Sequence, residues 1–238
     1  MRVEIWSDIA CPWCYVGKAR FENALEAFPH RDQVQVVHRS FELDPDRAKG
    51  DVQPVISMLT KKYGMSEAQA QAGEENLGAQ ATAEGLEYRT RGRDHGNTFD
   101  MHRLLHFAKE QGRQDELIQA LYKANFAEER SLFSEGDERL VELAVAAGLE
   151  AEGARKVLAE PAAYADEVRA DEREAAQLGA NGVPFFVLDR KFGVSGAQPT
   201  EVFTQALTQA WGERSPLKLI DEGGAEACGP DGCAVPQH

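Results

Sequence analysis

The sequence predicts an α/β fold in which a small sheet is interrupted by a long helical segment. Strand-like runs, rich in β-branched and aromatic residues, occur only near the two ends of the folded part, within residues 2–43 and 182–195. Between about 45 and 178 these signals almost vanish, and apolar residues recur at helical spacing instead. The two observations together favour a sheet with its own helices and a helical subdomain inserted into it.

The first unit reads as strand, helix and strand. Residues 2–7 predict a strand, residues 12–28 carry an apolar helical stripe, and residues 33–43 predict a second strand of mixed burial. Because a helix connects the two strands, we expect a parallel pair with a right-handed crossover.

The inserted segment is expected to contain several helices. Ser66-Glu67-Ala68-Gln69 has the form of a capping box that opens a polar, alanine-rich helix. Asn97 is expected to cap a helix that runs through Ala108, with Asp100 favourably placed in its first turn. Further apolar helical stripes follow within residues 117–122, 140–147 and 164–178.

The second unit begins where the strand signals return. Residues 182–188 and 192–195 predict a hairpin around a turn at 189–191, and a helix follows from Pro199 to Gly212. The order β-α-β, helical insertion, α-β-β-α is that of a thioredoxin fold with a large inserted α-helical subdomain and a C-terminal tail. We therefore expect a discontinuous thioredoxin-like domain at 1–44 and 165–212, a helical insertion at 45–164 and a tail at 213–238.

The tetrad Cys11-Pro12-Trp13-Cys14 lies between the first predicted strand and its helix. A cysteine at a helix start faces unpaired N–H groups and the positive end of the helix dipole, which favours the thiolate, the nucleophile of thiol–disulfide exchange. The second cysteine, one turn further on, can close a disulfide and release a mixed-disulfide intermediate. Pro12 suits the first helical turn, where its missing N–H has no partner to lose. The tetrad therefore predicts redox chemistry, with Cys11 attacking and Cys14 resolving.

Charge and cysteine spacing restrict the partners and the compartment. The 238 residues carry a formal net charge of −14, which repels nucleic acid and anionic lipid, so neither is expected as a partner. The N-terminal residues show no signal-peptide pattern and no stretch is apolar enough to span a bilayer, so we expect a cytoplasmic protein. In a reducing compartment, close cysteine pairs favour redox chemistry or metal binding over structural disulfides, although incidental reduced thiols stay an alternative.

Three stretches carry a resemblance to a known family. Residues 7–17 resemble the active-site stretch of the DsbA family, and more narrowly of its FrnE-type branch, which shares a fold with 2-hydroxychromene-2-carboxylate isomerases and kappa-class glutathione transferases. Residues 97–104 resemble the helical-domain motif of that branch, and residues 182–187 its cis-proline loop. The resemblance implies a thioredoxin fold with a helical insertion and dithiol–disulfide oxidoreductase activity.

The resemblance also implies site residues. It suggests that the Val183–Pro184 peptide is cis, that Pro184 packs against the redox cysteines, and that the backbone at Val183 pairs with an extended substrate chain. Trp13 and Phe185 can form an apolar rim for client chains, although ordinary partial burial is an alternative for Phe185. His102 can face the redox groove or be a satisfied helix histidine.

Two features leave alternatives open. Asp8 precedes the redox turn and either accepts a proton from Cys14 or caps the turn, and capping is favoured. Cys228 and Cys233 flank Gly-Pro-Asp-Gly, a strong turn sequence, so they are expected to form a second redox pair that exchanges with Cys11 and Cys14. The alternatives for this pair are a labile disulfide that tunes access to the active site and, more simply, an isolated local disulfide or free thiols.

The leading hypothesis is an enzyme, a protein thiol–disulfide oxidoreductase or isomerase acting on protein substrates with disulfides or thiols. It needs no metal or organic cofactor, and glutathione can serve as its redox partner. Two alternatives come from other classes: a glutathione-dependent isomerase or transferase with a pocket over Cys11, and a zinc-binding protein that uses all four cysteines.

Overall fold

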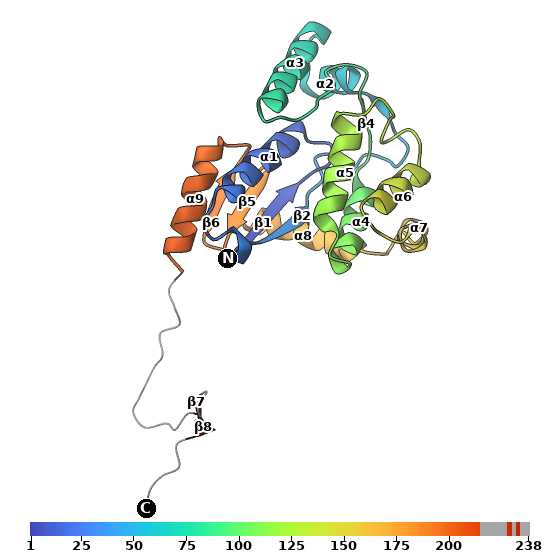
Figure 1. The fold of residues 1–238 in the computed structure, drawn as a ribbon. Helices are drawn as coiled ribbons and strands as arrows, with labels where there is room; N and C mark the ends of the chain where they lie inside the picture. Colours follow the sequence, from blue (N-terminus) through green and yellow to red (C-terminus); the bar gives the residue numbers. More distant parts are fainter. Residues whose placement is uncertain (215–227, 230–231, 234–238) are drawn as a thin grey trace, which may run out of the picture.

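A four-stranded sheet carries the two units that the sequence predicts (Figure 1). The structure is a computed structural model and describes residues 1–214, 228–229 and 232–233. In the sheet the strand order is β2-β1-β5-β6, with β1 at Arg2–Ser7, β2 at Gln35–Ser40, β5 at Phe185–Leu188 and β6 at Phe192–Ser195. Strands β1 and β2 are parallel, while β5 pairs antiparallel with both β1 and β6. The expected parallel β-α-β unit and the hairpin are confirmed.

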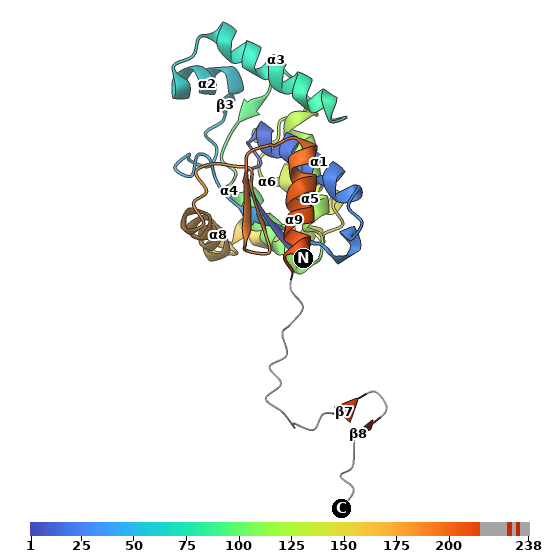
Figure 2. The ribbon, with the colours of Figure 1, turned by 90° about the vertical axis from the view of Figure 1, so that its left-hand side faces the viewer.

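Helices cover both faces of this sheet (Figure 2). Helices α1 (Pro12–Glu26) and α9 (Thr200–Gly212) lie on one face, where Phe21 and Phe203 pack edge-on and both contact Phe186 of β5. Helix α8 (Ala165–Gln177) covers the opposite face, where its Ala175 packs with Trp6. Alternation along β1 therefore sends Ile5 to one helical layer and Trp6 to the other.

The inserted segment forms a second core beside the sheet. It contains α4 (Phe99–Glu110), α5 (Gln114–Phe126), α6 (Asp137–Ala146) and α7 (Ala151–Ala159), whose apolar residues form one buried cluster. Cys11 and Cys14 belong to that same cluster, so the redox turn lies where the two cores meet.

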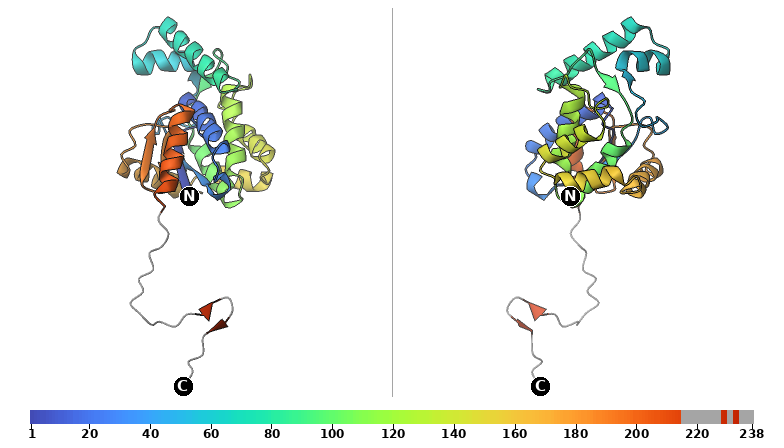
Figure 3. Two further views of the ribbon diagram at one scale, coloured as in Figure 1. Left: turned by 60° about the vertical axis from the view of Figure 1, so that its left-hand side comes forward. Right: turned by 90° about the vertical axis from the view of Figure 1, so that its right-hand side faces the viewer.

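Two further helices stand apart from this helical core (Figures 2 and 3). Helices α2 (Val55–Tyr63) and α3 (Glu67–Ala83) lie above the N-terminal end of α1 and join the rest of the chain through a short ribbon. The ribbon pairs β3 (Gln53–Pro54) with β4 (Asp94–His95). In the capping box that opens α3, the Ser66 side chain accepts from the Gln69 N–H, which confirms this prediction.

Three element boundaries differ from the sequence expectations. Strand β2 is shorter than expected because residues 31–33 form a turn of 3₁₀ helix before it. Strand β5 begins only at Phe185, after the Val183–Pro184 turn. Thr98, not Asn97, is the N-cap of α4; the Asn97 side chain instead accepts from the Phe99 N–H at 2.9 Å and donates to the Arg47 carbonyl.

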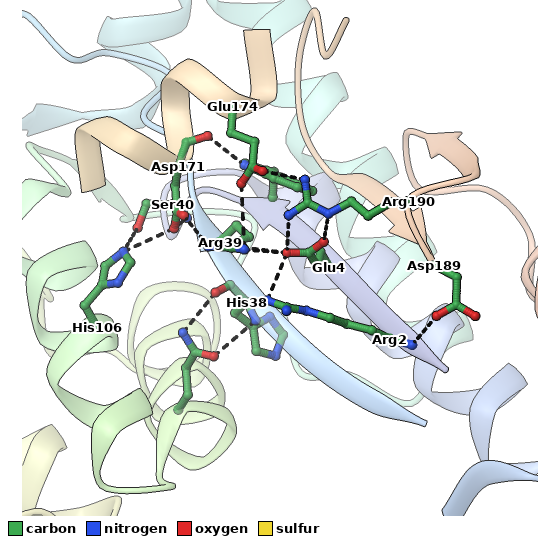
Figure 4. Close-up of polar contacts among 12 residues, drawn as sticks. Arg2, Glu4, His38, Arg39, Ser40, His106, Asp171, Glu174, Asp189 and Arg190 are labelled. Carbon is green, nitrogen blue, oxygen red and sulfur yellow. Dashed lines mark hydrogen bonds and ion pairs between the residues drawn. The ribbon is translucent and has the colours of Figure 1, made fainter. Parts of the chain in front are cut away.

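A buried charge network fixes α8 to the sheet (Figure 4). Asp171 of α8 accepts hydrogen bonds from Arg39 at 2.8 Å and from the Ser40 N–H at 2.9 Å, and its second oxygen lies 3.2 Å from His106 Nε2. Arg39 also donates to Glu4 of β1, which Arg190 holds from the other side. The network therefore joins α4 and α8 to β1, to β2 and to the turn between β5 and β6.

We predict that Asp171→Asn lowers the free energy of unfolding by about 3 kcal/mol at pH 7, because Arg39 and His106 lose a buried anionic partner. Urea denaturation followed by circular dichroism measures the change. Asp166→Asn, at an exposed position in the first turn of the same helix, is the matched control and should cost less than about 1 kcal/mol. Equal losses in both variants would contradict this role.

The same network predicts how stability depends on pH. Burial would raise the pKa of Asp171, but hydrogen bonds from His106 and Ser40 and the charge of Arg39 outweigh it, so the pKa lies below its ordinary value. Such a carboxylate contributes stability that is complete above its unfolded pKa, about 4, and is lost as the pH falls through its lower folded value. The difference between wild type and Asp171→Asn should therefore shrink below about pH 4.

Candidate active site

The redox turn places Cys11 at the N-cap of α1. Its backbone is extended, with φ −87° and ψ 111°, and Pro12 follows in the first turn. The Cys11 carbonyl accepts from the N–H groups of Cys14 and Tyr15 at 3.0 and 3.3 Å. The Cys11 side chain thus lies at the helix end where N–H groups have no intrahelical acceptor.

Hydrogen bonds from three directions hold this turn. The Asp8 carboxylate accepts from the N–H groups of Ala10 at 3.2 Å and Leu43 at 2.7 Å, and the Asp8 carbonyl accepts from the Cys11 N–H. From the helical core, the buried Asn125 side chain of α5 donates to the Ile9 carbonyl at 2.8 Å. The turn is therefore tied to the sheet domain and to the insertion at once.

The two cysteines differ in what they can meet. Both are thiols and both are buried, with 4% of Cys11 and 1% of Cys14 exposed. Cys11 lines a cavity and its Sγ lies 3.6 Å from the Val183 carbonyl oxygen, whereas Cys14 does not line that cavity. A ligand in the cavity therefore reaches the Cys11 sulfur, with Cys14 behind it.

The surroundings of Cys14 strongly favour its neutral thiol over the thiolate. Burial raises the pKa of Cys14 well above its ordinary value, and the hydrogen bond and charge of Cys11 raise it further. The negative charge of Asp8 adds to this effect, while a backbone hydrogen bond from Asp8 opposes it. Cys14 is thus held as a proton carrier next to the cavity-facing Cys11.

Asp8 is placed to cap the turn. Burial would raise its pKa, but the neighbouring His102 and the N–H groups of Leu43 and Ala10 outweigh burial and hold the pKa below its ordinary value. A carboxylate so stabilised is a weak base. Of the two roles considered from the sequence, the geometry favours capping.

Pro184 packs against the first helix at a glycine. The Val183–Pro184 peptide is cis, as the resemblance implies. A Cβ at Gly17 of α1 would lie 2.9 Å from Pro184 Cγ and 3.2 Å from Ala197 Cβ, closer than side-chain carbons approach. Glycine at position 17 therefore lets the proline loop come close to the redox helix.

Two expected substrate-binding residues lie elsewhere. His102 is buried under the turn, with Nε2 3.5 Å from Asp8 Oδ1, and does not line the cavity. Phe185 packs against Trp6 on the sheet face under α8, with ring centroids 6.2 Å apart, and is not at the rim. Strand alternation turns Phe185 inward, and the first turns of α4 place His102 toward β1. Trp13 and Val183, in contrast, do line the cavity.

The cavity beside Cys11 has a volume of about 380 Å³ and mostly apolar walls. Helices α2 and α3 supply nearly half of the residues that line it, including Val55, Met58, Leu59, Ala70 and Leu77. The described residues include six exposed large hydrophobic side chains, and four of them border this cavity: Trp13, Leu43, Tyr63 and Met65. The α2 residues were not predicted to form part of the site, although Val55, Leu59 and Tyr63 follow helical spacing in the sequence.

Comparison with known proteins identifies the family. The model of the DSBA-like thioredoxin domain family matches residues 2–208, which is most of the chain. The chain belongs to this family of thiol–disulfide oxidoreductases. It is also similar to a solved structure described as probable DsbA oxidoreductase SCO1869 from Streptomyces coelicolor, with 80% identity, a TM-score of 0.91 and complete coverage of both chains.

Two more distant proteins extend the comparison. Uncharacterized protein YwbO of Bacillus subtilis (strain 168) is 28% identical over 210 residues, covering 87% of this chain and 96% of YwbO. The cytosolic disulfide reductase DsbM from Pseudomonas aeruginosa, solved with glutathione, is 18% identical with a TM-score of 0.59 and covers 88% and 98% of the two chains. At that identity the likeness to DsbM shows a shared fold.

For the second cysteine pair, the structure describes the backbone of residues 228–229 and 232–233. Strands β7 (Cys228–Gly229) and β8 (Gly232–Cys233) pair antiparallel, with Cys228 opposite Cys233. Among described residues, no group of three or more His, Cys, Asp or Glu side chains is arranged to hold a metal ion. The helices of this described part include none with the length and apolarity needed to cross a membrane.

We predict that Asp8→Asn lowers the pKa of Cys14, because removing the negative charge makes the Cys14 thiolate less costly. The pH dependence of Cys14 alkylation is measured by mass spectrometry in a Cys11→Ala background, where Cys14 is the one thiol left in the active site. With Asp8 intact, the midpoint should stay above about 8.5, since burial dominates. Adding Asp166→Asn instead should leave the midpoint unchanged, and an upward shift with Asp8→Asn would contradict the assignment.

Proposed function

We propose that this protein is a thiol–disulfide oxidoreductase or isomerase for protein substrates, with Cys11 as nucleophile and Cys14 as resolving thiol. One observation carries the proposal: Cys11 forms part of the wall of an apolar cavity at the start of α1, with the buried Cys14 thiol in the first turn of the same helix. The Val183 carbonyl lies 3.6 Å from Cys11 Sγ, and Pro184, the next residue, packs against Gly17 of α1.

The reaction follows from this arrangement in two steps. The Cys11 thiolate attacks one sulfur of a substrate disulfide; a new S–S bond forms, the substrate bond breaks, and the second substrate sulfur leaves with the electron pair and takes up a proton. Cys14 then loses its proton and attacks Cys11, which releases the first substrate sulfur as a thiol and leaves the Cys11–Cys14 disulfide. Run backward, the same steps oxidise a substrate dithiol.

The cavity supports protein segments over glutathione as the main substrate. Glutathione carries two carboxylates and an ammonium group, which a dedicated site must pair. The charged residues that line the cavity are already engaged: Glu74 pairs with Arg93, Asp94 accepts from Ser131 and Ser134, and Lys62 donates to the Leu43 carbonyl. Glutathione remains suited to recycling the dithiol, since a small thiol needs only access to Cys11.

The glutathione-dependent enzyme and the zinc-binding protein, the two other hypotheses, need different cysteines. A glutathione-dependent isomerase or transferase would retain activity without Cys14. A Cys₄ zinc site would need Cys228 and Cys233, whose side chains lie outside the described residues. Zinc content and the need for Cys14 therefore separate the three functions.

Location and branch are also proposals. The four cysteines form two close pairs with none between Cys14 and Cys228, which supports work in a reducing cytoplasm. The net charge of −14 supports protein clients without nucleic acid or membrane as partners. The Cys-Pro-Trp-Cys tetrad and residues 97–104 support assignment to the FrnE-type branch.

We also propose that Cys228 and Cys233 form a second redox pair that exchanges with Cys11 and Cys14. The backbone pairing of Cys228 with Cys233 supports a local disulfide across the turn. Attachment to the same chain gives the pair a high effective concentration at the site.

The roles of the two active-site cysteines predict different phenotypes. Cys11→Ser should abolish insulin reduction, because no sulfur remains to form the mixed disulfide. Cys14→Ser should accumulate that mixed disulfide, which non-reducing electrophoresis and mass spectrometry detect. Turnover that survives Cys11→Ser, or that survives Cys14→Ala with glutathione, would contradict the proposal.

Exchange with the second cysteine pair predicts a further product. In the trapped Cys14→Ser protein, peptides that contain Cys228 or Cys233 are expected to be linked to Cys11, and their complete absence would count against exchange.

The apolar border of the cavity predicts a change in substrate affinity. Tyr63→Ser should raise the KM for reduced or disulfide-bonded protein substrates about three- to tenfold, as expected from losing about 1 kcal/mol of apolar contact. Reaction of Cys11 with a small aromatic disulfide should change little. Val145→Ser, at a similarly exposed apolar residue of α6 away from the cavity, is the control. An equal KM shift in both variants would contradict a docking role for this border.

A further inference from the structure

One cavity-lining residue is not explained by the redox pair. His95 of β4 lines the same cavity as Cys11 and is 6% exposed. Its Nε2 is buried without a hydrogen-bond partner and lies 3.7 Å from Asp44 Oδ2. Buried histidine nitrogens are normally hydrogen-bonded, so an unpaired one in the wall of a reactive cavity calls for a physical reason.

The histidine ring is positioned without its nitrogen atoms. The backbone of His95 pairs with Gln53 in the β3–β4 ribbon. Its imidazole packs against Phe133, with ring centroids 6.3 Å apart, and the next residue, Gly96, touches Phe133 so closely that a Cβ would lie 2.8 Å from that ring. Backbone pairing and ring packing thus fix His95 while Nε2 keeps no hydrogen-bond partner.

Charges on three segments face the imidazole: the loop before α1, the loop after β2, and α2. Burial lowers the pKa of His95, and the positive charges of Arg47 and of Lys62 on α2 lower it further. Asp8, before α1, and Asp44, after β2, act in the opposite direction, and the net pKa lies below the ordinary value. Near pH 7 the ring is therefore neutral and able to accept a proton.

Other titratable groups that line the cavity are less suited to this task. Glu74 is paired with Arg93, Asp94 accepts from two serine hydroxyls, and Lys62 is a cation. Asp8 lies under the redox turn and is not part of the cavity wall. Among described residues that line the cavity, His95 is the neutral base without a partner.

We propose that His95 is a catalytic base that accepts the proton of the substrate thiol when a substrate dithiol attacks the Cys11–Cys14 disulfide of the oxidised protein. This inference rests on the proposed function. The substrate R–SH gives its proton to His95, and its sulfur forms a bond with Cys11 as the Cys11–Cys14 bond breaks. The electron pair of the broken bond goes to Cys14, which takes up a proton from the solvent, and His95 returns its own to the solvent. In the reducing direction, protonated His95 gives a proton to the leaving substrate sulfur.

The need for such a base follows from the substrate. A cysteine thiol in an unfolded chain has a pKa of about 8.5, so only a few per cent is thiolate at pH 7. A positioned base removes that limitation and typically contributes 10²–10⁴-fold. The benefit disappears when the substrate is already ionised, and this makes the role measurable.

The test is the pH dependence of kcat/KM for oxidation of a peptide dithiol by the oxidised full-length protein, from pH 5.5 to 9.5. His95→Gln should lose at least about tenfold at pH 7 and should approach wild type above pH 9, where the substrate supplies its own thiolate. With thionitrobenzoate, a thiol that is ionised at pH 7, the two proteins should react at similar rates. His30→Gln, at a histidine that stacks on Trp211 and does not line the cavity, is the matched control and should follow wild type throughout.

Several outcomes would overturn the inference. A His95→Gln profile that matches wild type, or that is lowered by the same factor at every pH and for thionitrobenzoate, means that His95 is not a base for the substrate. His95→Asn is measured beside it, with near-ultraviolet circular dichroism, so that one poorly folded variant does not decide the result. Oxidation that does not require Cys11 would instead overturn the proposed function itself, which Cys11→Ser reports separately.

Discussion

The position of the redox turn at the start of α1 is the constraint on which the site depends. Asp8 holds the turn from the sheet side through the N–H groups of Ala10 and Leu43, and Asn125 holds it from the helical side through the Ile9 carbonyl. These bonds set Cys11 at the helix N-cap, in the cavity wall, and leave Cys14 one turn behind it. This placement explains why Cys11 is the cysteine reached from the cavity, why it attacks before Cys14, and why Cys14 is held as a neutral thiol.

The fold supports that placement by joining two cores at the turn. The sheet and its helices α1, α8 and α9 form one part, and α4 to α7 pack as the second, to whose cluster the cysteines belong. The buried ion network around Asp171 fixes α8 to the sheet face opposite α1, so the sheet cannot shift under the redox helix without exposing paired charges (Figure 4). Helices α2 and α3, which belong to neither core, add apolar side chains to the wall of the cavity beside Cys11.

Local sequence signals predicted the framework well. The β-rich run before Cys11, the apolar helical stripe after it and the capping box at Ser66 each depend on neighbours in the sequence, and the structure contains all three. Contacts between distant segments were not predictable in the same way. Phe185 and His102 have the right residue types for a binding surface, yet packing against Trp6 and Asp8 buries them.

The cavity illustrates the same limit. In the sequence, Met58, Leu59 and Tyr63 indicate only that α2 has an apolar face. The neighbouring residues do not predict that this face lines the cavity beside Cys11. His95 is likewise one residue of a polar loop in the sequence, and only the β3–β4 pairing brings it to the cavity wall. Pairing and packing across the insertion therefore determine which side chains surround the reactive sulfur.

The most direct test of this account is competitive alkylation of the fully reduced wild-type protein at pH 7, followed cysteine by cysteine with mass spectrometry. If Cys11 is the reachable sulfur of the helix start and Cys14 the buried thiol behind it, Cys11 should be labelled at least about tenfold faster than Cys14. Equal labelling of the two cysteines, or faster labelling of Cys14, would contradict the account.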